Sequence, residues 1–185
     1  MAGEMPPAIA QSPSASPVQV AQQSADTLLY FETGTYVVRV YRRSGNPVLN
    51  VYNKYTDINE QNRVPVVVAP PQDSDDLWRT YTNQSDTVEY LARVSPTGET
   101  ELEIYDVAAQ TRRRESGFNA TFGFPQSLLG QNIGTVLTTL RADGWAVAGT
   151  SNDIFQLTRE QSRLRLKTDP QTRAVTYAHL IDLSQ

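Results

Sequence analysis

The feature that most constrains this 185-residue chain is a pattern that occurs twice. The second copy is offset from the first by 54 residues in its first half and 53 in its second, so the connecting turn is one residue shorter. In each copy apolar and polar residues alternate on both sides of a glycine, which is typical of an antiparallel hairpin. The matched residues are Tyr36-x-x-Arg39-Val40, Gly45, Leu49-x-Val51-Tyr52-Asn53 and Tyr90-x-x-Arg93-Val94, Gly98, Leu102-x-Ile104-Tyr105-Asp106.

The two predicted hairpins cover residues 35–55 and 87–107, and their alternation assigns one apolar side to each. Tyr36 and Tyr90 fall on that inward side. Arg93, Glu101 and Glu103 fall on the outward side, where we expect Arg93 to pair with a glutamate across the strands and the glutamates to be solvated. Further strands are predicted at 28–31, 64–68 and 78–82.

The pattern changes after Gly117. Within residues 125–144 the apolar residues have helical spacing, with Ser127 as the predicted N-cap and Gly144 just after the helix. Gly130 and Gly134 suggest a close approach of that helix to a sheet. Residues 145–148, 154–159, 163–168 and 173–183 are then predicted to form an antiparallel meander.

The expected fold class is therefore α+β and dominated by strands. Duplicated antiparallel hairpins are followed by one helix and a β-meander, and the hairpins could form a barrel, a sandwich or one large sheet. The chain divides into three regions: a tether of Pro, Ala, Ser and Gln at 1–27, the duplicated hairpins at 28–117, and the helix with its meander at 118–185, packed on the hairpins as one unit.

The N-terminal segment resembles the stretch directly after a removed signal or lipid-attachment site, although no intact signal peptide is present in the chain. We therefore expect an extracytoplasmic location, in a periplasm, a lumen or the medium. A lipid tether through the N-terminus is compatible with this expectation, and no run of apolar residues is long enough to span a membrane.

Composition argues against several kinds of chemistry. The chain has no cysteine and one histidine, so thiolate catalysis and His- or Cys-rich zinc sites cannot be built. No catalytic residues, cofactor or metal are predicted. His179 lies on an apolar strand side, where a hydrogen-bonded structural histidine is expected rather than a pocket acid or base. Asp73-x-Asp75-Asp76 begins like a calcium loop but lacks its glycine and its glutamate, so a solvated loop is expected.

Arginines and tyrosines provide the candidate binding residues. The net charge of −4 argues against nucleic acid as a partner, and Arg112 to Arg114, like Arg159, Arg163 and Arg165, are expected to be solvated or to face a partner rather than to bind a polyanion. Exposed aromatic residues beside arginine are typical of interfaces. The candidate site therefore comprises Tyr41, Tyr52, Tyr105, Arg39 and Arg93.

The segments 48–56, 90–94 and 102–105 resemble β-rich exported proteins of cyanobacteria that have no assigned function, over roughly residues 30–110. A fainter similarity is to the small β-barrel lysozyme inhibitors of the envelope, although the cysteine pair of that family is absent. These observations lead us to expect a non-catalytic exported module that binds another protein or an envelope component. The alternatives are a protein that binds a small apolar ligand, such as a lipid or pigment, and a lysozyme-inhibitor-like envelope protein.

Overall fold

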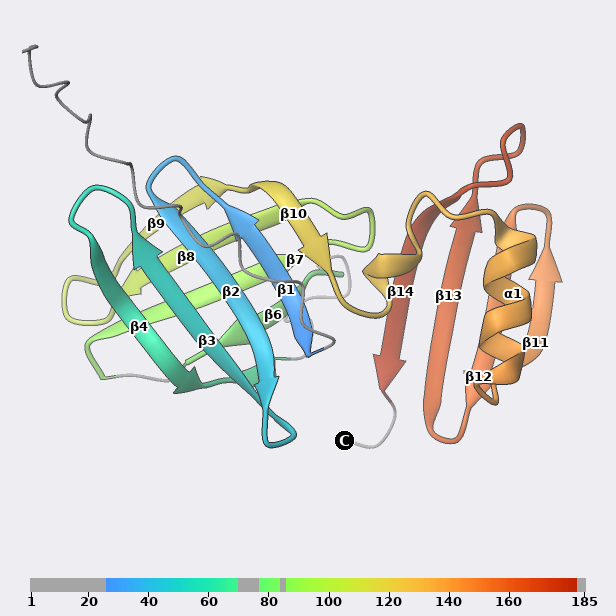
Figure 1. Cartoon of the computed structure of the whole chain (residues 1–185), viewed down its shortest axis with the longest axis horizontal. Helices are drawn as coiled ribbons and strands as arrows, with labels where there is room; N and C mark the ends of the chain where they lie inside the picture. The colour runs from blue at the N-terminus through green and yellow to red at the C-terminus, as the bar shows by residue number, and fades with distance from the viewer. Residues whose placement is uncertain (1–25, 70–76, 84–85, 183–185) are drawn as a thin grey trace, which may run out of the picture.

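The repeated pattern forms the middle of two five-stranded antiparallel sheets (Figure 1). The computed structural model describes residues 26–69, 77–83 and 86–182. The first copy supplies β2 and β3 of sheet A, and the second supplies β7 and β8 of sheet B. In spatial order, sheet A consists of β10 (Phe118–Phe122), β1 (Thr27–Glu32), β2 (Tyr36–Arg43), β3 (Asn46–Asn53) and β4 (Ile58–Pro65). Sheet B consists of β5 (Val67–Ala69), β6 (Arg79–Thr82), β7 (Val88–Val94), β8 (Thr100–Asp106) and β9 (Thr111–Ser116).

Each copy of the repeat is followed by two strands, of which the first stays in its own sheet and the second belongs to the sheet of the other copy. β4 ends sheet A, and after the single residue Val66 the chain continues as β5, which pairs with β6 in sheet B. In the same way β9 ends sheet B, and after Gly117 the chain continues as β10, which pairs with β1 in sheet A. The two copies are therefore joined at two corners, and neither sheet is made by one copy alone.

The two sheets face each other across one apolar core. The equivalent inward residues of the two copies are buried, as the alternation predicted, except Ile104, which is partly buried and packs against the core. Of the three arrangements left open by the sequence, the structure has two packed sheets, and within the described residues no strand pairing closes them into a barrel. The core consists of Leu29, Phe31, Tyr36, Val38, Val40, Leu49, Val51, Val66, Tyr81, Tyr90, Ala92, Val94 and Leu102.

The C-terminal unit is a four-stranded antiparallel meander with one helix on one face (Figure 1). Its second core lies between helix and sheet and includes Ile133, Val136 and Leu140 of the helix. The elements are the short 3-10 helix η1 (Gln126–Leu128), α1 (Ile133–Ala142), β11 (Ala146–Ser151), β12 (Ile154–Arg159), β13 (Ser162–Thr168) and β14 (Val175–Asp182).

The helix begins later than the sequence predicted. Asn132, not Ser127, is the N-cap, and its side-chain oxygen accepts a hydrogen bond of 2.9 Å from the Gly134 amide. Gly130 has φ +78°, which ends the preceding turn before α1 starts, and Gly134 is exposed, so this pair does not bring the helix close to a sheet. Gly144, with φ +85°, follows the end of the helix as predicted.

The boundary between the two structured regions also differs from the expected one. Residues 118–122, which the sequence pattern places in the C-terminal unit, form β10 and pair with β1. The pattern does not predict β9 and β10 as strands, and β4 begins before the predicted apolar run. Apart from residues 26 and 27, the segment predicted as a tether lies outside the described residues.

The C-terminal unit contacts the sandwich through the free edge of β14. The Ala178 amide donates a hydrogen bond of 2.9 Å to the carbonyl of Pro96, in the turn between β7 and β8. The Ala178 carbonyl accepts one of 3.0 Å from the Gln126 side chain. In the same turn Gly98 lies so close to Leu129 that a Cβ would be 2.9 Å from its Cδ1. The edge of β14 is thus satisfied by groups outside its own sheet.

A methyl group at Gly117 should destabilise the protein, because this corner leaves no room for one. A Cβ there would lie 2.2 Å from Thr100 Oγ1 and 2.6 Å from Phe31 Cδ2. We expect Gly117→Ala to lower the free energy of unfolding by about 2 kcal/mol, measured by urea denaturation. Gly34→Ala is the control, since no atom lies within 4 Å of its Cβ, and its effect should stay below about 1 kcal/mol. Equal losses of stability in Gly117→Ala and Gly34→Ala would contradict the claim that the corner at Gly117 has no room for a side chain.

Candidate functional site

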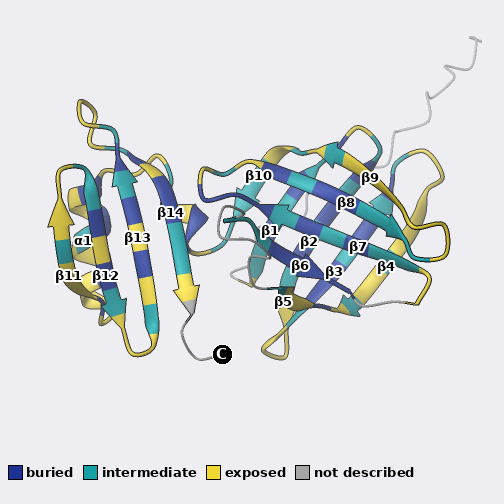
Figure 2. Cartoon of the chain, turned by 180° about the vertical axis from the view of Figure 1, so that it is seen from behind, coloured by how far each residue is buried: buried dark blue, intermediate teal, exposed yellow. Residues whose placement is uncertain are grey.

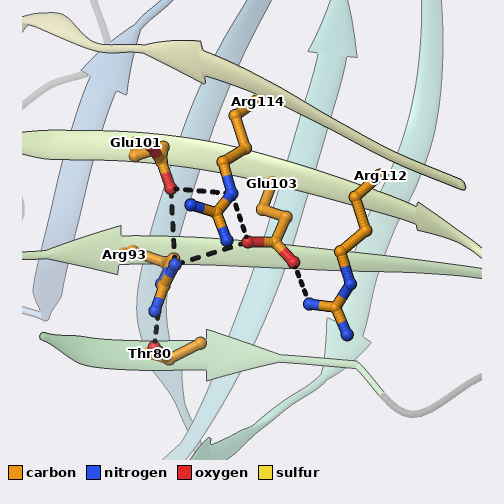
Figure 3. Close-up of polar contacts among 6 residues, drawn as sticks. All are labelled: Thr80, Arg93, Glu101, Glu103, Arg112 and Arg114. Carbon is orange, nitrogen blue, oxygen red and sulfur yellow. Dashed lines mark hydrogen bonds and ion pairs between the residues drawn. The ribbon is translucent and has the colours of Figure 1, made fainter. Parts of the chain in front are cut away.

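The outer face of sheet B carries an ion-pair network, which we call the arginine face (Figure 3). Its members come from three adjacent strands, because Arg93 of β7 pairs in register with Glu101 of β8, and Glu103 pairs with Arg114 of β9. Arg112, in register with Tyr105 two residues further along β8, also reaches Glu103. The alternation of β8 places both glutamates on this side, opposite to the core.

Glu103 is the centre of this network. Its side chain is 1% exposed although it points away from the core. Its carboxylate accepts contacts from Arg114 Nε at 2.9 Å, from Arg93 Nη1 at 3.3 Å and from Arg112 Nη1. Glu101 pairs with Arg93 at 3.4 Å. The predicted pairing of Arg93 is confirmed, but the prediction that Glu103 is solvated is wrong, because three guanidinium groups cover it.

Two of these arginines also make cation–π contacts with aromatic rings. The Arg112 guanidinium lies 4.6 Å from the centre of the Tyr105 ring, and that of Arg93 lies 5.7 Å from the Trp78 ring. Arg93 also donates a hydrogen bond of 3.4 Å to the Thr80 hydroxyl. Carboxylate contacts on one side and aromatic contacts on the other restrict the rotamers of these long side chains.

This arrangement is suited to recognition rather than to proton transfer. Within the network three guanidinium groups face the carboxylates of Glu101 and Glu103, and Glu89 of β7, in register with Tyr105, adds a third carboxylate to the same face. Arg112 and Arg114 remain 55% and 56% exposed, so their remaining N–H groups can bind carboxylate or phosphate oxygens of a partner. Arginine keeps its proton at physiological pH and therefore does not act as an acid or base there.

The five residues predicted as a binding site lie on two opposite faces of the sandwich. Arg93 and Tyr105 belong to the arginine face. Tyr41, Tyr52 and Arg39 lie on the outer face of sheet A, where the Arg39 guanidinium is 4.8 Å from the Tyr41 ring centre. The repeat places equivalent residues on equivalent outer faces, and the face-to-face packing of the sheets then separates them.

The hydroxyl of Tyr52 donates a hydrogen bond to Asp57, in the turn after β3. This hydrogen bond, together with desolvation and the charge of Asp57, raises the pKa of the Tyr52 hydroxyl above its ordinary value. Tyr41 and Tyr52 on sheet A thus lie apart from Tyr105 on sheet B, and the three tyrosines do not form one cluster.

Arg113 points to the other side of β9 from its two neighbours. Its guanidinium contacts the Tyr36 hydroxyl and lies 3.6 Å from Glu115. Burial would raise the pKa of the Glu115 carboxyl, but hydrogen bonds from Thr33 and Thr35, with the charge of Arg113, lower it overall. The Arg112 to Arg114 run is thus not one solvated cluster: two members belong to the arginine face and one closes the end of the sandwich.

Tyr90, the equivalent of Tyr36 in the second copy, lies at the same end of the core. Burial, with a smaller contribution from the Glu60 charge, raises the pKa of its hydroxyl to about 12. It therefore stays protonated at physiological pH.

His179 is not on the apolar side of β14. It faces away from α1, beside Arg165 on β13, and its ring meets that of Tyr177 edge to face at 6.2 Å. Desolvation, together with the charges of Arg79 and Arg165, lowers the pKa of the His179 imidazole. Because Arg79 belongs to β6, this face of the C-terminal sheet lies next to the sandwich.

Metal binding receives no support from the part of the chain that the structure describes. Within it, no three His, Asp or Glu side chains are grouped so that they could hold a metal ion. Asp73, Asp75 and Asp76 lie outside the described residues. Across those same described ranges, no helix has the length and apolar character that crossing a membrane would require.

Comparison with known proteins gave no relative. A scan against protein-family models found no match, and neither did searches of curated proteins and of solved structures.

Removing the charge of Glu103 should destabilise the fold far more than removing that of Glu101. Glu103→Gln leaves three guanidinium groups around a neutral amide, and we expect a loss of about 3 kcal/mol in the free energy of unfolding at pH 7. Glu101 is 21% exposed, so Glu101→Gln should cost less than about 1 kcal/mol. Urea denaturation of both variants measures the difference. A Glu103→Gln variant no less stable than Glu101→Gln would show that the carboxylate is not the centre of the network.

Acid should weaken the fold partly through His179. Its folded-state pKa lies below the unfolded value of about 6.5, so the unfolded chain takes up the proton first and stability falls as pH drops below about 6.5. We expect the free energy of unfolding of the wild type to fall more steeply between pH 7 and 5 than that of His179→Gln. Parallel curves, or a steeper fall for the variant, would rule this out.

Proposed function

We propose that this protein is a non-catalytic, extracytoplasmic binding module that engages a protein partner through the arginine face. The observation that carries the proposal is Glu103, a buried carboxylate that holds Arg112 and Arg114 half-exposed beside Tyr105. Arginine, tyrosine and tryptophan are the residues that most often dominate binding energy in protein interfaces. Arginines that are already ordered lose less entropy on binding.

The composition of this face also indicates the chemistry of the partner. The outward N–H groups of the half-exposed Arg112 and Arg114 match a surface that presents carboxylates. The inward side chains of the two sheets pack into one core, with Leu29, Phe31, Leu49 and Leu102 fully buried. This packing favours binding at the outer surface over enclosure of an apolar ligand. The proposed compartment is supported by the Pro-, Ala-, Ser- and Gln-rich composition of residues 1–26.

The proposal is tested by comparing the proteins that immobilised variants capture from an envelope extract of the native host. Arg112→Ala and Tyr105→Ala change the arginine face. The double variant Arg42→Ala, Arg43→Ala removes exposed cations from the end of β2 and serves as the control. We expect one reproducible partner for the wild type and the control, with binding by Arg112→Ala or Tyr105→Ala weakened by about 2 kcal/mol. Affinity is measured by calorimetry with the purified partner.

Circular dichroism and thermal unfolding establish that each variant is folded before its binding is measured. Loss of binding in the control to the same extent would show a general charge effect. Equal capture by all variants, or no reproducible capture by the wild type, would overturn the proposal.

A further inference from the structure

The face of the C-terminal sheet that points away from α1 carries a straight row of cations. Arg163, Arg165 and Lys167 occupy alternate positions of β13 and therefore project from the same side, opposite to the buried Leu164 and Leu166. Figure 2 shows this face, with α1 behind the sheet. We call these three residues the cationic row. Alternate residues of a strand are separated by about 6.7 Å, so the row extends for roughly 13 Å along β13.

The cationic row differs from the other run of basic residues in one respect. The arginines of β9 all have carboxylate partners: Glu101, Glu103 and Glu115. For the cationic row, no carboxylate among the described residues lies within ion-pair distance. Cations about 6.7 Å apart on one strand repel each other weakly. An anionic ligand lying along the row would relieve this repulsion.

The neighbouring strands add polar groups and extend the positive region. On β12, Gln156 pairs in register with Arg165, and Thr158 pairs with Arg163. These amide and hydroxyl groups can donate and accept hydrogen bonds beside the cations. On the other side, across β14, Arg79 of the sandwich lies close enough to influence His179. The result is a flat cationic strip with neutral hydrogen-bonding groups along one side.

We propose that this strip binds an extended acidic polysaccharide, with its carboxylate or sulfate groups on the cationic row and its hydroxyls on Gln156 and Thr158. Arginine binds such planar or tetrahedral anions through two N–H groups at once. A linear polymer with regularly spaced charges lies along a straight row of cations without bending, and the neighbouring amide and hydroxyl groups suit sugar hydroxyls.

Two other polyanions fit this face less well. Single-stranded nucleic acid is held by stacking of its bases on exposed aromatic rings, but Tyr177 is 9% exposed and its ring is already covered by Lys167 at 4.8 Å. An anionic membrane surface is bound by larger basic clusters, of about four to eight residues, or by an apolar surface that enters the lipid. The cationic row offers three cations, and Ile181, 40% exposed, is an isolated apolar side chain beside it.

The test measures binding of defined polymers at low ionic strength. Oligomers of alginate, which carries carboxylates, and of dextran sulfate are titrated into wild-type protein by calorimetry or fluorescence anisotropy. The same is done for the triple variant Arg163→Ala, Arg165→Ala, Lys167→Ala. The matched control is Arg42→Ala, Arg43→Ala, Arg141→Ala, which removes the same number of exposed cations elsewhere. Single-stranded poly(dT) and vesicles containing anionic phospholipid form the two comparison arms.

We expect the wild type and the control to bind at least one polysaccharide, with an affinity that falls as salt is added. The row variant should bind at least about ten-fold more weakly and show a smaller salt dependence. Hydrogen exchange should show protection of residues 162–168 on binding, and circular dichroism should show that the row variant is folded. The cationic row and the arginine face lie on different sheets, so the two experiments are independent. Failure of polysaccharide binding would not contradict the proposed protein partner, and failure of partner capture would not contradict polysaccharide binding.

Three results would overturn the proposal. One is the absence of salt-sensitive binding to both polysaccharides. Another is equal weakening in the control variant, which would indicate overall charge rather than the row. The third is tighter binding of poly(dT) or of anionic vesicles through the same three residues, which would assign the strip to a different polyanion.

Discussion

Each copy of the repeated hairpin has an apolar side that packs against the opposite sheet, whose middle strands are the other copy. Tyr36, Val38 and Val40 of the first copy pack against Tyr90, Ala92 and Val94 of the second in one core. A two-stranded hairpin is at most marginally stable in water, so the hydrophobic contact between the copies provides the framework for the surface features of the sandwich. The outward residues of both sheets, including the arginine face, are positioned by the inward residues with which they alternate.

The two basic runs show how the same residue type takes different roles according to its neighbours. On β9 the arginines are neutralised across the strand by glutamates of β8, and the buried carboxylate of Glu103 gives them a fixed geometry. On β13 none of the in-register neighbours of the cationic row is a carboxylate. They are Ile154, Gln156 and Thr158 on β12 and Tyr177, His179 and Ile181 on β14. Electrostatic complementarity within the fold is therefore complete on one sheet and open on the other, which is why the two faces suit different kinds of partner.

The alternation of apolar and polar residues was enough to predict the hairpins, their inward residues and the meander, because successive side chains of a strand point to opposite faces. It was not enough for features set by distant strands. The three adjacent arginines of β9 suggest a solvated segment, and only the register of β9 against β8 shows their carboxylate partners. Glu103 is buried by guanidinium groups from β7 and β9, which are distant in the sequence. The separation of Tyr52 from Tyr105 follows from packing of the two sheets. The start of α1 depends on Asn132, which also forms a β-bridge with Ala174, more than forty residues away in the chain.

The exchange of terminal strands between the two copies has a consequence for synthesis and folding. β1 begins at Thr27, but one of its edges is completed by β10, which ends at residue 122. Until that residue is made, this edge of the nascent chain carries unsatisfied backbone groups and can pair with other chains. Contacts of such long sequence separation also slow folding.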